Sequence, residues 1–219
     1  MDTEKVYETL DSIAEKTQLE TNDINMLLKL SKTDNSEIKS YIAELLVMSC
    51  GEESEKVLIN MCNDADEIVR INACDSLSAF PTLDTYNQLI KCLYHDKSAV
   101  VKTYAILSLA DIINQLEIDT TKLEELFVRF SKDKDISISA ACFKGLYILG
   151  KENCLKKLFD LFPTKNYQDR CMIVNILGDI LNDENNNYIM SELEKNRKTE
   201  TSKAVNLIID NIIGGHKNN

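Results

Sequence analysis

The sequence has few residues that interrupt regular structure. Its 219 residues include only two prolines and six glycines, and tryptophan is absent. Because Gly and Pro are the strongest local breakers of helices and strands, their scarcity leaves long uninterrupted segments. Apolar residues recur in those segments with the spacing of amphipathic helices, which predicts a largely helical chain.

Long apolar runs are also missing, and none approaches the roughly 20 residues that span a bilayer. The first ten residues, MDTEKVYETL, are charged and predict no secretory signal. The seven cysteines are odd in number and form no CxxC pair, so we expect reduced thiols used in packing. These features predict a soluble cytoplasmic protein without a membrane partner.

A positive charge balance is lacking as well. The net charge of −11 argues against nucleic acid, which selects basic surfaces. The charge is uneven: residues 1–100 carry 19 acidic and 9 basic side chains, and residues 101–219 carry 17 and 16. Such a block can steer a basic protein partner, although a solvated acidic surface kept for solubility is the simpler explanation.

The chain does contain a repeat, defined by Val69, Arg70, Ala73 and Leu77. The same pattern begins again, with weaker matches towards the end of the chain, at Ile38, Val101, Ile138 and Asp169. A second apolar set recurs independently, starting at Leu58, Leu89, Leu126, Leu158 and Ile189. Both sets step by 31 or 32 residues, with one step of 37. Two patterns that share one period and one insertion indicate paired helices in each repeat.

We therefore predict an all-α protein, an α-α superhelix in the form of a right-handed α-solenoid of about six helix pairs. No hinge rich in Pro or Ser divides the sequence, so residues 1–213 are expected to form a single array. Residues 214–219, GGHKNN, are expected to be a disordered C-terminal tail.

The first helix of each pair resembles that of HEAT repeats. Asp66, Val69, Arg70, Ala73 and Leu77 carry the resemblance, which extends over roughly residues 34–195. The short period is similar to that of the HEAT-like repeats of phycobilisome lyases. Tetratricopeptide repeats would require Trp, and ankyrin repeats a TPLH-like turn, which this chain lacks. The resemblance implies a fold and leaves the activity open.

Residues for catalysis or metal binding are sparse. Of the two histidines, His95 lies three residues after Cys92, but a metal site needs more ligands than this pair. No catalytic residue, cofactor site or metal site is predicted, so we expect a protein that is not an enzyme. A HEAT-like DNA glycosylase would need a basic, aromatic-lined face, and a HEAT-like lyase would need pigment-binding residues that the repeat pattern does not identify.

Protein binding is then the expected activity, and the solvent side of the second helices is the predicted site. In α-solenoids we expect these helices to line the concave surface. Exposed Met, Val and Tyr beside carboxylates suit a protein interface, although scattered apolar residues occur on any surface. The predicted binding residues are Met26, Glu53, Val57, Asn60, Asp84, Gln88, Lys91, Glu125, Val128, Lys157 and Tyr188. Acidic residues at the repeat starts, such as Asp66 and Asp96, form a second candidate surface, or they simply cap helices.

The most specific hypothesis is an immunity-type inhibitor, monomeric when free, that neutralises a basic bacterial toxin such as a nuclease. Small acidic proteins achieve this by electrostatic steering onto a cationic active site. The alternatives are an adaptor or assembly scaffold without inhibitory role and, third, a lyase-like or glycosylase-like enzyme.

Overall fold

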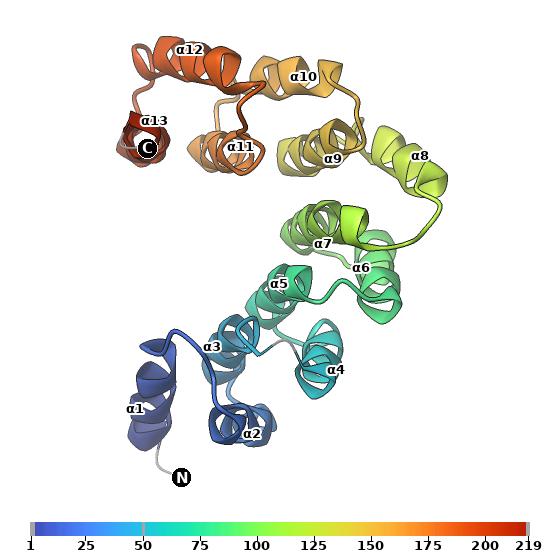
Figure 1. The fold of residues 1–219 in the computed structure, drawn as a ribbon, viewed down its shortest axis with the longest axis vertical. Coiled ribbons are helices and arrows are strands. Elements are labelled where there is room, and N and C mark those ends of the chain that lie inside the picture. The colour runs from blue at the N-terminus through green and yellow to red at the C-terminus, as the bar shows by residue number, and fades with distance from the viewer. Residues whose placement is uncertain (1–2, 50, 218–219) are drawn as a thin grey trace. The chain divides into compact units, whose positions relative to one another are not determined.

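The computed structural model describes residues 3–49 and 51–217. They form thirteen α-helices and no strand (Figure 1), which confirms the predicted all-α helical-repeat fold. The helices are α1 Thr3–Ala14, α2 Thr21–Leu30, α3 Ser36–Leu46, α4 Glu52–Met61, α5 Glu67–Ser76, α6 Leu83–His95, α7 Ala99–Ile112, α8 Thr121–Phe130, α9 Ile136–Ile148, α10 Asn153–Leu161, α11 Tyr167–Asp179, α12 Asn186–Arg197 and α13 Lys203–Lys217. None of these helices is long and apolar enough to cross a membrane.

The repeat alignment corresponds to six helix pairs followed by α13. Ala73 and Ala105, at equivalent positions of α5 and α7, are fully buried, as the predicted register requires. The longer step of 37 residues coincides with a fourteen-residue α7, the 3-10 turn Ile113–Gln115 that follows it, and the loop to α8. The insertion therefore lengthens a helix end and a loop and leaves the helix pairing unchanged.

Most of the first helices begin at a polar cap. The carboxylate of Asp66 accepts hydrogen bonds from the backbone N–H groups of Ile68 and Val69 and starts α5. Equivalent caps start α3, α7, α9 and α11, from Asn35, Ser98, Asp135 and Asn166 respectively. Capping thus accounts for Asp66 and Asp135 among the repeat-start acids.

Two compact units, residues 1–119 and 120–219, divide the chain. A single array over residues 1–213 was predicted, and the boundary falls within the inserted segment after α7. At the C-terminus, α13 continues to Lys217, so helix covers the first four residues of the segment predicted to be a disordered tail. Residues 218–219 of that segment lie outside the described residues.

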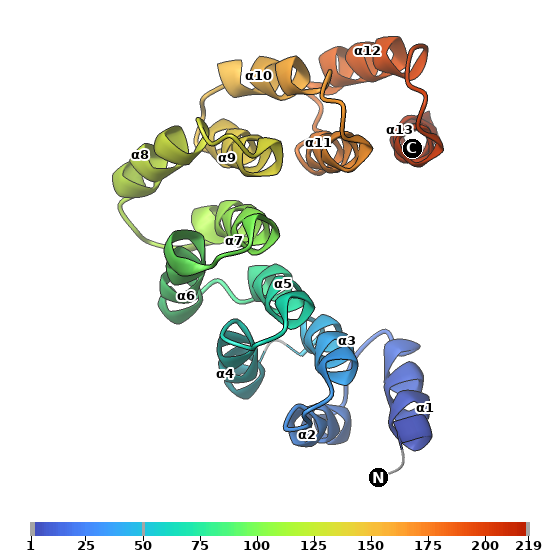
Figure 2. The same cartoon turned by 180° about the vertical axis from the view of Figure 1, so that it is seen from behind.

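Each unit is built from two layers of helices (Figures 1 and 2). In residues 1–119, α3, α5 and α7 pack directly side by side, whereas α4 and α6 touch each other much less. In residues 120–219, α9, α11 and α13 form the close-packed layer, and α10 and α12 lie beyond it. When neighbouring helices are closer together in one layer than in the other, the stack curves, and the layer with the closer helices lies on the inner side of the curve. The first helices therefore lie on the inner side of each unit.

Ion pairs tie successive repeats together. Lys39 Nζ lies 2.6 Å from Asp64 Oδ2, and Arg70 Nε lies 2.7 Å from Asp96 Oδ2. The Arg70 guanidinium also donates to the backbone oxygen of Asp64. Asp96 and Asp64, two acidic residues at the repeat starts, are thus paired with basic side chains between neighbouring repeats. In residues 120–219, Arg170 pairs with Glu200 in the same way, at 2.7 Å.

Candidate protein-binding surface

The predicted binding residues lie on the more widely spaced outer layer, not on a concave face as expected. Contacts along the first helices are closer, so curvature turns the second helices outward. Eight of the eleven residues are exposed, and Met26 and Val57 are half-buried. Gln88 was expected to face solvent but is 8% exposed, because its amide nitrogen turns towards Cys92 Sγ at 3.5 Å.

Five of these residues border two neighbouring grooves in residues 1–119. Asn60, Asp84, Gln88 and Lys91 line a groove of about 480 Å³ between α4 and α6. Val57 and Asn60 line a smaller one of about 280 Å³ between α2 and α4. These two outer grooves are therefore chemically mixed, with lysines as well as carboxylates among their lining residues.

Two of the predicted residues in the second unit have packing partners of their own. Lys157 Nζ lies 5.3 Å from the centre of the Phe143 ring, and the Tyr188 ring meets Phe159 edge-on at 5.6 Å. Both side chains are therefore partly engaged within residues 120–219.

A more distinctive groove, which the repeat pattern did not indicate, lies in the inner layer between α3 and α5. Its volume is about 480 Å³, and its lining residues are Ser36, Glu37, Ser40, Tyr41, Glu44, Asp66, Ile68 and Asn72. They include three carboxylates and no Lys or Arg, and the side chain of Ile68 is 56% exposed. We refer to these eight residues as the α3–α5 groove.

Neutral donors orient the carboxylates of this groove. Tyr7 donates a hydrogen bond to Glu37 at 3.1 Å, and Asn72 donates one to Glu44 at 2.7 Å. Tyr41 donates to Asp11 at 2.8 Å, and this bond raises the pKa of the Tyr41 hydroxyl, as do burial and the negative charge of Glu44. Because these donors carry no positive charge, they hold the carboxylates in place without neutralising them.

Helical spacing could have revealed the groove. Glu37, Tyr41 and Glu44 follow at intervals of four and three on α3, so they share one face of that helix. Ile68 and Asn72 are four apart on α5 and face them across the groove. No binding residue is predicted on the solvent side of the first helices, because the second helices are expected to line the concave face.

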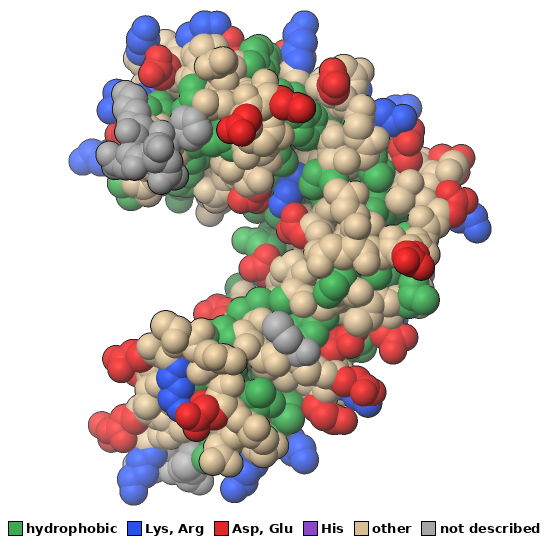
Figure 3. Space-filling view, in the orientation of Figure 1, with side chains coloured by type: hydrophobic (Ala, Val, Ile, Leu, Met, Phe, Trp, Pro, Cys, Tyr) green, Lys and Arg blue, Asp and Glu red, His purple; other side chains and the backbone are tan. Residues whose placement is uncertain are grey.

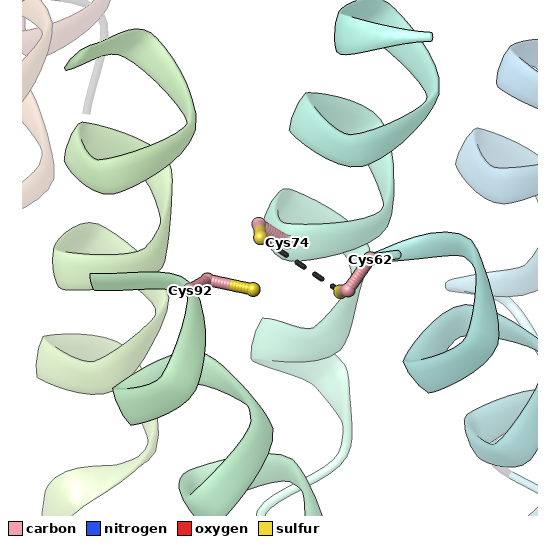
Figure 4. A group of neighbouring side chains, drawn as sticks. All are labelled: Cys62, Cys74 and Cys92. Carbon is pink, nitrogen blue, oxygen red and sulfur yellow. Dashed lines mark hydrogen bonds between the residues drawn. The ribbon is translucent and has the colours of Figure 1, made fainter. Parts of the chain in front are cut away.

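Three buried cysteines form a second cluster that the sequence spacing did not indicate (Figure 4). Cys62 caps the end of α4, Cys74 lies within α5, and Cys92 lies on α6. Their Sγ atoms all lie within 4.8 Å of one another, and those of Cys62 and Cys74 are 3.8 Å apart. All three thiols are at least 96% buried. Repeats that stack next to each other bring these side chains together from distant positions in the chain.

Hydrogen bonding within the cluster favours a thiolate at Cys92. Hydrogen bonds from the Cys62 and Cys74 thiols lower the pKa of Cys92, and the Gln88 amide adds to the effect, against the opposing influence of burial. The hydrogen bond to Cys62, together with burial, raises the pKa of Cys74. By contrast, Cys92 and His95, which lie three residues apart in the sequence, do not share one environment, since Cys92 is buried and His95 is exposed.

Comparisons with known proteins agree with this architecture. HEAT repeats match residues 24–110. The chain is similar to one in the complex of CpcE and CpcF of phycocyanin lyase from Nostoc sp. PCC7120, with 15% identity, a TM-score of 0.64, and coverage of 98% of this chain and 90% of that one. Human deoxyhypusine hydroxylase in complex with glycerol gives 13% identity and a TM-score of 0.44, with coverage of 99% and 97%. No curated protein sequence matches the chain.

At these identities the structural likeness bears on the fold alone. The repeat match, the paired helices and the phycocyanin lyase likeness agree on one architecture, a scaffold suited to protein binding. The chain is a HEAT-like α-helical repeat protein.

Proposed function

We propose that this protein is a non-enzymatic scaffold that binds a basic protein partner in the α3–α5 groove. One observation carries the proposal: three carboxylates and an exposed isoleucine line one groove, which has no basic side chain in its lining. Carboxylates beside an apolar contact site are the complement of a basic segment that also carries an apolar side chain.

The charge of the surrounding unit supports the same partner. Residues 1–119 carry 22 acidic and 10 basic side chains, a net charge of −12, whereas residues 120–219 carry 14 and 15, a net charge of +1. Figure 3 shows carboxylates spread over the visible face of residues 1–119. A field of this sign attracts a cationic surface and raises its rate of association.

Inhibition of a basic toxin is the most specific form of this proposal, and the acidic charge is its only support. An adaptor that assembles a complex without blocking an activity is the alternative. The similar chain comes from a complex of two proteins, which supports a protein partner under either form. A partner whose own activity stops on binding would favour the inhibitor.

Binding kinetics with the co-purified partner, identified by mass spectrometry, test the proposal. Glu37→Gln with Glu44→Gln removes two charges while keeping similar shape and hydrogen-bonding capacity. We expect the association rate to fall roughly three- to tenfold at low salt and the difference to shrink at high salt. Ile68→Ser should chiefly speed dissociation, because apolar contacts act after docking.

Two controls locate the interface. Glu194→Gln changes an exposed carboxylate of α12 and should leave both rates unchanged. Asp179, another carboxylate of residues 120–219, would be a poorer control, because its Oδ2 atom lies 3.2 Å from Nζ of the buried Lys144. The charge reversals Glu53→Lys and Asp84→Lys test the outer layer. If they slow association while Glu37→Gln/Glu44→Gln associates at the wild-type rate, the interface lies at the outer grooves instead. An acidic partner, or rates that ignore salt and all these changes, would refute the electrostatic proposal.

A further inference from the structure

The cysteine cluster of residues 1–119 has the composition of a metal site. We propose that Cys62, Cys74 and Cys92 bind one soft metal ion, Cu(I), through three thiolates. The proposal is independent of the partner-binding groove, since none of the three cysteines lines it.

The sulfur positions already approximate those of a three-coordinate site. With metal–sulfur bonds of about 2.3 Å, three thiolates around one ion stand about 3.8 to 4.0 Å apart. Cys62 and Cys74 are at 3.8 Å, and neither remaining separation exceeds 4.8 Å. Each remaining pair therefore needs to close by less than about 1 Å, which is within the reach of a small change in side-chain torsion. The thiols point towards one another from three helices (Figure 4).

The ligand set selects the ion. Thiolate ligands favour Cu(I) and Zn(II) among biologically available metals. Structural zinc almost always takes four ligands, and among the described residues this cluster supplies only three sulfurs, without His, Asp or Glu. Burial leaves little access for water as a fourth ligand, since Cys62, Cys74 and Cys92 are 3%, 0% and 4% exposed. A soft monovalent ion that accepts three sulfurs fits this environment best.

The surroundings supply an entry path and partial charge compensation. Gln88 lines the α4–α6 groove, and its amide nitrogen lies 3.5 Å from Cys92 Sγ. Movement of this single side chain would connect the groove with the thiols. Lys91 lines the same groove and brings a positive charge to it. A bound thiolate site, negative overall, would thus lie beside an amide donor and an ammonium group.

Titration of the full-length, reduced protein with Cu(I) under anaerobic conditions tests the site. A chromogenic Cu(I) chelator serves as competitor, and X-ray absorption reports the ligands. We expect one tightly held Cu(I) per chain, about three sulfur neighbours near 2.3 Å, and a raised melting temperature. Cys74→Ala should lose the tight site and lower the affinity for Cu(I) at least about tenfold. Mutating a residue that merely orients a metal ligand already costs about that much, and Cys74 is itself a proposed ligand.

Cys142→Ala is the matched control, because Cys142 is equally buried on α9 but lies outside the cluster. It should retain full binding. If Cys74→Ala fails to fold, the wild-type absorption spectrum still decides, since a site with nitrogen or oxygen neighbours contradicts three thiolates. Preference for Zn(II) in a parallel titration, equal loss in Cys142→Ala, or no binding by the reduced wild type would each overturn the proposal.

Discussion

Arg70 shows how one residue of the repeat serves two neighbours. Its guanidinium binds both carboxylate oxygens of Asp96 in the next repeat and two backbone oxygens before its own helix. The side chains of Arg70 and Asp96 are only 7% and 9% exposed. Removing one member would leave a buried charge without its partner, which costs far more than losing a surface pair.

The pair predicts a dependence of stability on acid. Burial raises the pKa of Asp96, but hydrogen bonds from Arg70 and the backbone of Ser98 outweigh it, so the net pKa is lowered. A lowered folded-state pKa contributes stability above the unfolded value of about 4, and this contribution is lost as pH falls through the folded value. We expect Asp96→Asn to cost about 3 kcal/mol at pH 7 and much less below pH 3.

Urea denaturation of wild type and Asp96→Asn between pH 7 and pH 2.5 measures the effect. Asp84→Asn is the control, since Asp84 is exposed on α6. A difference between Asp96→Asn and wild type that stays constant over this pH range would show that the lost stability does not come from the carboxylate charge.

A close helix contact joins α8 and α9 at Gly145. A Cβ atom at Gly145 would lie 2.4 Å from Cε2 of Phe127, whose side chain is fully buried. The equivalent residues of α5 and α7 are Ser76 and Ser108, also small and buried, whereas that of α3 is the buried Leu45. A glycine at this position lets the large ring of α8 reach the surface of α9, so side-chain volume here sets the spacing of the helix pair.

We predict that Gly145→Ala destabilises the protein by about 1 to 3 kcal/mol, because the ring must move within a packed interior. Gly214→Ala in α13 is the control, since its Cβ would meet nothing within 4 Å, and alanine there should be neutral or stabilising. Thermal melting compares the two. Combining Gly145→Ala with Phe127→Leu should recover part of the lost stability, because the smaller side chain leaves room for the new methyl group. If Gly145→Ala is as stable as wild type and the second change adds nothing, this packing explanation is rejected.

At the scale of the whole molecule, charge and structure divide at the same place. The unit of residues 1–119 holds the entire net negative charge, while residues 120–219 are nearly neutral. Repulsion among like charges opposes folding of a compact unit, and salt screens exposed charges more than buried pairs.

We therefore predict that the free protein becomes more stable, by about 1 kcal/mol, as NaCl rises from a few millimolar to about 0.3 M. Glu15→Lys, at an exposed position of the acidic unit, should reproduce part of this gain at low salt. Glu194→Lys, in the neutral unit, should not. Melting temperatures of the wild type and both variants, measured at the two ionic strengths, test this prediction. If salt lowers the melting temperature of the wild type, attraction within ion pairs outweighs repulsion among the like charges.

The sequence alone determined the helix pairs, their period and their buried faces. Apolar periodicity and capping act within a few residues, so Ala73, Ala105 and the caps at Asp66 and Asp135 could be placed without coordinates. The overall charge imbalance and the HEAT-like resemblance were likewise readable from composition and pattern.

Only the tertiary structure decided which layer faces inward and which side chains meet between repeats. Curvature depends on differences in helix spacing summed over a stack, and no local pattern encodes it. The α3–α5 groove and the three thiols draw on neighbouring repeats, and the buried Gln88 follows from contact with one of those thiols. Such sites arise from packing between distant segments, which is why helical periodicity predicted the scaffold but neither the α3–α5 groove nor the thiol cluster.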